Sequence, residues 1–106
     1  MFKVVKKNDG EIRKITDNKT AINIVTKEIT PPFSLAILQT TNYNEKETTA
    51  YNRIYHVTEG LLILTFDNNR QELSIGDSCY VSQGATYSMS DTFKAFVINQ
   101  PAFGIK

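Results

Sequence analysis

Apolar and polar residues alternate over short stretches of this chain, which is the pattern of a strand with one buried face. Thr20–Ile29 shows this alternation, and the pair Pro31-Pro32 then ends the segment because proline cannot donate to a strand ladder. Phe33–Thr41 resumes with apolar and β-branched residues, which favour extended structure. We therefore predict two strands separated by the proline pair.

The rest of the chain repeats short β-rich segments between turn residues. We predict six further strands, at Thr48–Thr58, Leu61–Phe66, Arg70–Ile75, Ser78–Ser82, Thr86–Ser90 and Phe93–Asn99. Gly, Asn and Asp tolerate unusual backbone angles, so we expect turns at Asn42–Lys46, Asp67–Asn69, Gly76-Asp77, Gly84 and Asp91-Thr92. Asn8–Asn18 could form at most a short helical turn. Several short strands at regular spacing predict an all-β fold, either a sandwich or a closed barrel in which alternate residues point inward.

Size and charge narrow the class of protein. The chain has 106 residues, enough for one domain and too few for two, so we assign residues 1–106 to a single domain. The formal net charge of +1 gives no field that would attract nucleic acid or a membrane surface, and no apolar run is long enough to span a bilayer. The single cysteine, and a start without the apolar core of a signal peptide, lead us to expect a cytoplasmic protein.

Three segments together resemble motifs of the cupins. Tyr55–Gly60 (YHVTEG) resembles the aromatic-x-Val-x-Glu-Gly strand end, and Gly76-Asp77 resembles the turn that opens the second cupin motif. Ser82–Tyr87 (SQGATY) lies where that motif has Pro-x-Gly-x-x-His. The resemblance implies a cupin-type double-stranded β-helix, also called a jelly-roll barrel.

Within the cupins, the chain is similar to the ethanolamine-utilisation cupin. The similarity lies in Tyr51-Asn52 before the motif strand, in the Gly84 turn and in the final segment Gln100–Phe103 (QPAF). That family also lacks the usual metal-binding histidines, and a kinase-like activity has been attributed to it. Because cupins host many functions, the resemblance leaves open whether this protein is an enzyme.

The residues at the metal-ligand positions of other cupins do not suit a metal here. The resemblance places Glu47 and Thr49, or the residues one position earlier, at the two early histidine positions. It places Arg53 at the glutamate position and Tyr87 at the later histidine position. Arginine stays protonated and cannot be a ligand, and the chain has only one histidine and one cysteine. We therefore expect neither a metal nor another cofactor.

Arg53 then becomes the main candidate for ligand binding. We predict a ligand site formed by six residues, Glu47, Thr49, Tyr51, Arg53, Tyr55 and Tyr87. The first five share one face if the segment is extended throughout. Arg53 could hold an anionic ligand, which a guanidinium binds with two parallel hydrogen bonds. It could instead pair with Glu47 inside the barrel, or point to solvent if the register is shifted by one residue.

Two other residues have reactive side chains. Strand alternation sends His56 to the face opposite Arg53, so we expect it on the outer side of the sheet. No neighbouring cation or helix start is placed to lower the pKa of Cys79, so we expect it to be a small core residue.

Three functions remain open from the sequence. The first is a binding protein that takes a small polar or anionic metabolite into the barrel. The second is a metal-independent enzyme, either an isomerase or lyase or one with the ethanolamine-utilisation type of activity, with Glu47, Tyr55 and Tyr87 as acid–base groups. The third is a structural dimer within a larger assembly. We expect a homodimer, because barrel edges need cover and apolar residues such as Phe2, Val4 and Val5 lie in an otherwise polar N-terminal segment.

Overall fold

The computed structural model describes residues 2–105, and this part of the chain contains eight strands. They are β1 (Glu11–Thr16), β2 (Lys19–Val25), β3 (Ser34–Thr48), β4 (Asn52–Gly60), β5 (Leu62–Phe66), β6 (Asn69–Leu73), β7 (Ser78–Val81) and β8 (Thr86–Gln100). One short 3-10 turn, Lys7–Asp9, precedes β1. Within the described range, no helix is long and apolar enough to cross a membrane.

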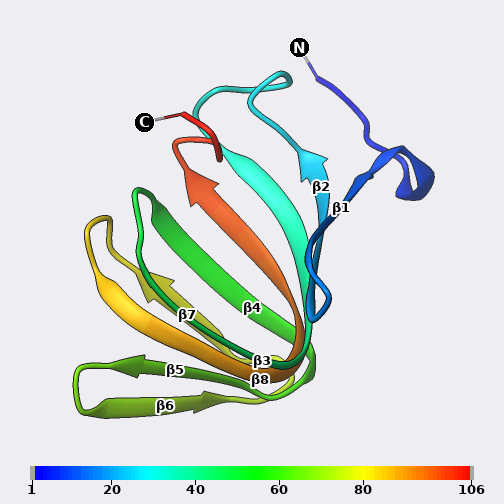
Figure 1. The fold of residues 1–106 in the computed structure, drawn as a ribbon. Coiled ribbons are helices and arrows are strands. Elements are labelled where there is room, and N and C mark those ends of the chain that lie inside the picture. Colours follow the sequence, from blue (N-terminus) through cyan, green and yellow to red (C-terminus); the bar gives the residue numbers. More distant parts are fainter. Residues whose placement is uncertain (1, 106) are drawn as a thin grey trace.

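The two long strands β3 and β8 form the centre of the architecture. They pair antiparallel along nearly their whole length. The register shifts near Asn42, which adopts a φ of 45°, and Asp91 on the partner strand adopts a φ of 90°. Such an irregularity bends the strands, so that one strand pair contributes to two sheets (Figure 1).

The bend divides the barrel wall into two sheets. The first has the order β1-β2-β3-β8-β4-β7 and uses the N-terminal half of β3 with the C-terminal half of β8. The second joins the other halves of β3 and β8 to the hairpin of β5 and β6. The sheets curl towards one another around an interior (Figure 1), as in a jelly-roll barrel. The prediction of an all-β jelly-roll fold is confirmed.

Some local predictions are wrong. Asn8–Asn18, expected to form a helical turn at most, contains β1. Asn42–Lys46 and Asp91-Thr92 are expected as turns but continue β3 and β8 through the bend. Residues 43–46 and Asp91 take part in the ladder between these strands, which satisfies their backbone groups. Conversely, the expected strand Thr48–Thr58 is interrupted at residues 49–51, which connect β3 to β4.

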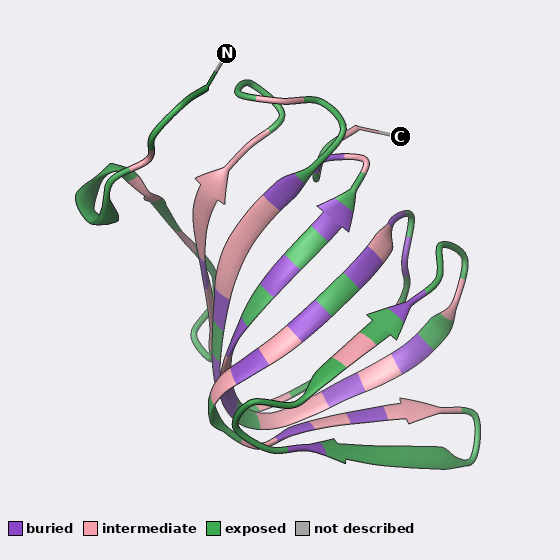
Figure 2. Cartoon of the chain, turned by 180° about the vertical axis from the view of Figure 1, so that it is seen from behind, coloured by how far each residue is buried: buried purple, intermediate pink, exposed green. Residues whose placement is uncertain are grey.

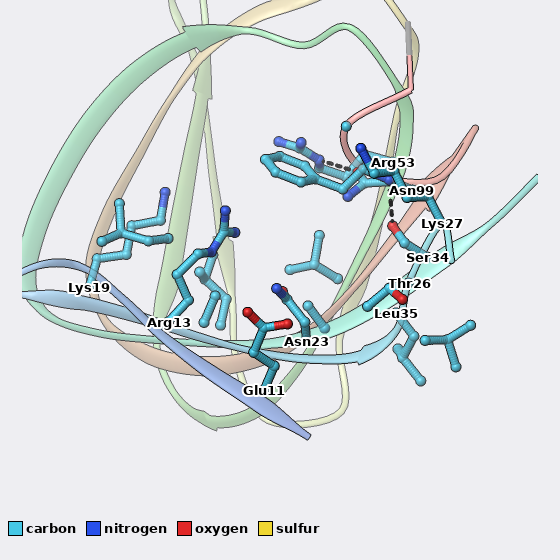
Figure 3. Close-up of a pocket in the computed structure, with 18 of the residues that line it drawn as sticks. Glu11, Arg13, Lys19, Asn23, Thr26, Lys27, Ser34, Leu35, Arg53 and Asn99 are labelled. Carbon is cyan, nitrogen blue, oxygen red and sulfur yellow. Dashed lines mark hydrogen bonds between the residues drawn. The ribbon is translucent and has the colours of Figure 1, made fainter. Parts of the chain in front are cut away.

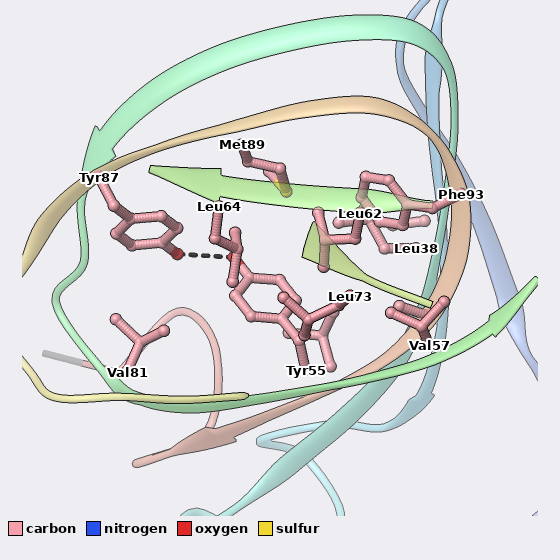
Figure 4. Packing of buried hydrophobic residues seen from close by; sticks show 13 residues of the cluster. Leu38, Tyr55, Val57, Leu62, Leu64, Leu73, Val81, Tyr87, Met89 and Phe93 are labelled. Carbon is pink, nitrogen blue, oxygen red and sulfur yellow. Dashed lines mark hydrogen bonds between the residues drawn. The ribbon is translucent and has the colours of Figure 1, made fainter. Parts of the chain in front are cut away.

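Inward-facing residues alternate along the strands and fill part of the barrel. Along β8, Phe93, Ala95, Val97 and Asn99 are buried, while the residues between them are more exposed (Figure 2). Apolar side chains from both sheets pack together between them (Figure 4). The largest fully buried members include Tyr55, Tyr87, Leu62, Leu64, Met89, Val57 and Val81.

The outer face of the first sheet carries an apolar patch formed by two neighbouring rows of residues. The first row runs across five strands through Ile12, Ile22, Ile37, Phe96 and His56. The second row contains Ile98, Ile54 and Tyr80. Of these residues Ile12 is 73% and Tyr80 61% exposed, and Phe96, Ile98 and Ile54 are also exposed, so residues 2–105 leave much of the patch uncovered.

Gly60 lies at the end of β4, where the chain passes close to the bend of β8. Its φ is +77°, and a Cβ atom there would lie 2.3 Å from the carbonyl oxygen of Thr92. We predict that Gly60→Ala lowers the free energy of unfolding by about 3 kcal/mol or more, because a backbone clash adds to the cost of left-handed geometry. Urea unfolding measures this loss.

Gly84→Ala is the matched control. Gly84 has a φ of +90°, but nothing lies within 4 Å of its Cβ position. This variant should lose only the backbone term, about 1–2 kcal/mol. Equal losses in the two variants would contradict the clash at Gly60.

Candidate functional site

A cavity of about 500 Å³ lies inside the barrel beside the packed core. Its wall consists of side chains of β1, β2, β3, β4 and β8, together with the segment after β2 and the turn after β8 (Figure 3). Small-molecule sites commonly measure about 300–1,000 Å³, so the volume suits a metabolite. The apolar part of the wall includes Ile15, Ala21, Leu38, Met89 and Val97, and the charged part includes Arg13, Lys19, Glu45, Glu47 and Arg53.

Arg53 lies on this wall within a buried hydrogen-bond network and is only 7% exposed. Its Nε donates to Asn99 Oδ1 at 2.7 Å. Its Nη1 donates to Glu47 Oε1 at 2.5 Å and to the hydroxyl of Tyr87 at 3.0 Å. Arg53 therefore faces the interior and pairs with Glu47, and the alternative that it points to solvent is wrong. That it also holds a ligand stays a prediction.

One donor group of Arg53 remains available to a ligand. Its Nη2 donates to none of the residues 2–105. In the same range, the one buried side-chain nitrogen or oxygen without a hydrogen-bond partner is Arg13 Nε. Arg53 Nη2 also lacks a partner, so it is not buried. The cavity wall thus presents a charged donor that the network has already fixed in place.

Tyr55 and Tyr87 complete the network and keep their protons. Tyr87 donates to Glu47 Oε1 at 2.9 Å, so Tyr55 is the donor in the 2.6 Å contact between the two hydroxyls. Burial raises the pKa of both phenols. Burial alone would lower the pKa of Arg53, but the two phenols and Glu47 raise it, so the guanidinium stays charged.

Thr49 and Tyr51 lie outside this network and do not line the cavity, although both are predicted for the site. The Thr49 hydroxyl donates to the carbonyl of Tyr51 and accepts from its N–H, each at 3.0 Å. The Tyr51 hydroxyl accepts a 2.8 Å hydrogen bond from Gly104 N–H, and its ring centre is 5.5 Å from that of Phe103. The assumption of one continuous face fails because residues 49–51 form a bend. Tyr87 also does not line the cavity, although it belongs to the network.

A second ion pair on the wall is not anticipated by the sequence analysis. Lys19 Nζ lies 2.6 Å from Glu45 Oε1, which also accepts a 2.8 Å hydrogen bond from the Tyr43 hydroxyl. Burial alone would raise the pKa of Glu45, but the hydrogen bonds from Lys19 and Tyr43 outweigh it and lower this pKa. The wrong prediction of a turn at Asn42–Lys46 is the reason that this cluster is not predicted, because residues in a turn are not expected to face the interior.

Arg13 is a third cation of the cavity wall, and it is also missed because β1 is missed. No acidic side chain within residues 2–105 forms an ion pair with it. Its guanidinium carbon lies 5.0 Å from the centre of the Phe103 ring, and its Nε is buried without a hydrogen-bond partner. Glu11, Arg13 and Ile15 all line the cavity, so the period-two spacing of β1 is the signal that could have revealed them.

The two remaining candidates lie away from the cavity. His56 is on the outer side of the first sheet, as predicted, and its Nδ1 is 2.7 Å from Ser78 Oγ. Cys79 is half-buried against the core, and burial raises the pKa of its thiol. A raised pKa leaves the thiol protonated and weakly reactive.

The interior does not fit the metal of typical cupins. Glu47, Arg53 and Tyr87 do converge, but the single carboxylate already binds the guanidinium and the phenol is protonated. In the described part of the chain, no three or more His, Cys, Asp or Glu side chains are grouped so that they could hold a metal ion. A divalent cation beside Arg53 would also be repelled by its charge.

Comparison of the sequence alone finds no relative: no known family model matches it, and no curated protein matches it. Comparison of the structure does. An RmlC-like cupin from Shewanella frigidimarina superposes with a TM-score of 0.81 at 14% identity, covering 93% of this chain and 90% of that one. The chain has the cupin fold.

Two further solved structures have the same cupin fold. KdgF from Halomonas sp. has a TM-score of 0.84 at 9% identity and covers 98% of this chain and 97% of its own. An ethanolamine-utilisation protein, EutQ of Salmonella typhimurium, has a TM-score of 0.75 at 19% identity and covers 79% of this chain and 70% of its own. The predicted resemblance to cupins, including the ethanolamine-utilisation cupin, is confirmed for the fold.

The network around Arg53 predicts a large effect of mutation on stability. Arg53→Ala should lower the free energy of unfolding by about 3 kcal/mol, because it leaves Glu47 without its cation in a largely buried position. Adding Glu47→Gln should restore part of this loss, because it removes the unpaired charge. Urea unfolding of the single and double variants measures both effects.

Arg70→Ala is the control for this experiment. Arg70 pairs with Glu72 on the surface, where the two side chains are 60% and 58% exposed. Its loss should change stability by about 0.5 kcal/mol at most. An Arg53 variant as stable as this control would show that the network does not hold the interior together.

Proposed function

We propose that this protein binds a small polar or anionic metabolite in the barrel cavity without a metal. The observation that carries the proposal is a cavity of about 500 Å³ on whose wall two cations, Arg53 and Lys19, are already held by partners of their own. Arg53 is fixed by Glu47 and Asn99, and Lys19 is fixed by Glu45. A ligand would therefore not have to order these side chains, which lowers the entropic cost of binding.

The same geometry gives less support to the two other functions. Acid–base catalysis works best with groups whose pKa lies near the working pH, whereas burial raises the pKa of Tyr55 and Tyr87 further from neutrality. A purely structural barrel would be expected to have its interior filled. The likeness to EutQ and KdgF is a likeness of fold, and cupin-type barrels host many functions, so it supplies no activity for this chain.

A metabolite library screened by thermal shift tests the proposal. A compound that binds the native state, present at about 100 times its Kd, adds about 2.7 kcal/mol of stability and should raise Tm by about 10 °C or more. In Ala36→Phe, the new ring would enter the cavity, so the same compound should lose its effect.

Gln39→Phe is the matched control, because Gln39 lies exposed on the same strand and outside the cavity. It should respond to the compound as the wild type does. A shift of equal size in Ala36→Phe would place binding elsewhere on the protein. A broad library that shifts no Tm would contradict the proposed function.

We also propose that two copies associate through the apolar patch on the first sheet. The two rows of the patch contain no Asp, Glu, Lys or Arg, so two copies of the same face meet without like-charge repulsion. Contact between identical faces gives a closed two-fold dimer. Phe2 and Val4, noted in the sequence, are 90% and 57% exposed and add apolar surface.

Light scattering at tens of micromolar should give twice the chain mass of 12.0 kDa. Ile98→Lys places a charge within the patch and should yield a monomer, because burying an unpaired charge is unfavourable. Gln71→Lys, at an exposed position on β6, should remain dimeric. A monomeric wild-type protein would rule out this mode of association.

A further inference from the structure

We propose that the ligand of the cavity is an organic carboxylate, with its charged head on Arg13 and its apolar body on the inner wall. This rests on the proposed function, since it assigns a ligand class to the same cavity. It also moves the main anchoring role from Arg53, which the sequence favours, to a residue of β1.

The charge balance of the interior singles out Arg13. Lys19 and Arg53 are each paired with a carboxylate, Glu45 and Glu47 respectively. Arg13 lines the same cavity, yet no described residue forms an ion pair with it and its Nε is buried without a partner. The Arg13 Nη groups also donate to none of the residues 2–105 and are not buried, so an anionic ligand in the cavity would accept hydrogen bonds from them.

This balance matches a ligand with a single negative charge. The three inner cations face two inner carboxylates, which leaves one positive charge in excess. The other charged residues of the wall, Glu11, Lys27 and Glu28, are exposed, so water and salt screen them. A phosphate dianion would need a second unpaired inner cation, whereas one guanidinium suffices to bind a carboxylate through two parallel hydrogen bonds.

The turn after β8 holds Arg13 in position. Arg13 extends from β1 into the cavity (Figure 3), and its guanidinium carbon lies 5.0 Å from the centre of the Phe103 ring. Tyr51 supports that turn through its ring contact with Phe103 and its hydrogen bond from Gly104. Tyr51, which the sequence predicts as a ligand contact, is therefore a positioning residue for the anion site.

The rest of the inner wall suits an apolar group. Ala21, Leu38, Met89 and Val97 line the cavity and belong to, or lie beside, the buried core. A ligand that was polar throughout would find no hydrogen-bond partner on this side. A carboxylate carrying several methylene groups or a ring would remove the apolar wall from water, which is favourable in proportion to the area buried.

Calorimetric titration with straight-chain carboxylates from butyrate to octanoate, and with the matching primary amides, tests the assignment. Affinity should rise about fourfold per added methylene until the cavity is filled. Each acid should bind at least about tenfold more tightly than its amide, because it is the charge that Arg13 recognises. Inorganic phosphate should bind more weakly than the longer acids.

Arg13→Gln should weaken binding of the acids at least about tenfold and change the affinity of the amides by less than about twofold. Without ligand, its Tm should differ little from that of the wild type, because the guanidinium loses only its contact with the Phe103 ring and no ion pair or hydrogen bond. Lys14→Gln is the matched control: Lys14 is the neighbouring residue on β1, 69% exposed and paired with Asp17, so binding should be unchanged.

The outcomes separate this inference from the proposed function. If amides or other neutral compounds bind and Arg13→Gln has no effect on the acids, the cavity binds ligands but the carboxylate assignment is wrong. Tighter binding of phosphate than of every carboxylate would also overturn it. If neither acids nor amides bind, the assignment fails, and the metabolite screen then decides whether the cavity binds another class of compound.

Discussion

The pairing of β3 with β8 is the constraint on which the rest of the structure depends. Each strand has 15 residues, and each takes part in both sheets. Their shared bend sets how the two sheets face one another, and so where residues from different sheets meet. Glu47 and Tyr87 lie beyond the bend in the second sheet, whereas Arg53 lies on β4 in the first. The bend brings these three side chains into contact.

The Arg53 network connects the two sheets across the interior, at positions where the resemblance places the metal ligands of other cupins. Its hydrogen bonds join Arg53 and Tyr55 of the first sheet to Glu47 and Tyr87 of the second. A buried ion pair is often no more stabilising than apolar packing, but breaking one is costly. The network therefore fixes the distance between the sheets beside the cavity and makes a substitution at Arg53 hard to tolerate.

The all-β class and the convergence of Glu47, Arg53 and Tyr87 could be predicted from turn residues and motif spacing. Two parts of the fold are not predicted, namely β1 and the Asn42–Lys46 part of β3. Both contribute polar side chains to the wall of the cavity. In β1, Arg13 points inward and Ile12 lies in the apolar outer patch, so the usual relation of polarity to burial is reversed. In Asn42–Lys46, Glu45 faces the cavity and every other residue except Tyr43 is exposed, so the sequence of this part of β3 is as polar as that of a loop. Neither of these strand segments can be recognised from its sequence before the cavity is known.

The long ladder of β3 and β8 also has a consequence for how the molecule is made. The hairpins β1–β2 and β5–β6 join neighbouring segments and can form as soon as they are synthesised. β3 must wait for its partner at residues 86–100, at the far end of the chain, and such non-local pairing slows folding. β2 covers one edge of the N-terminal half of β3, but during this interval the edge that β8 will cover is open to strands of other molecules. The time between synthesis of β3 and release of β8 is therefore the period in which the nascent chain exposes this edge.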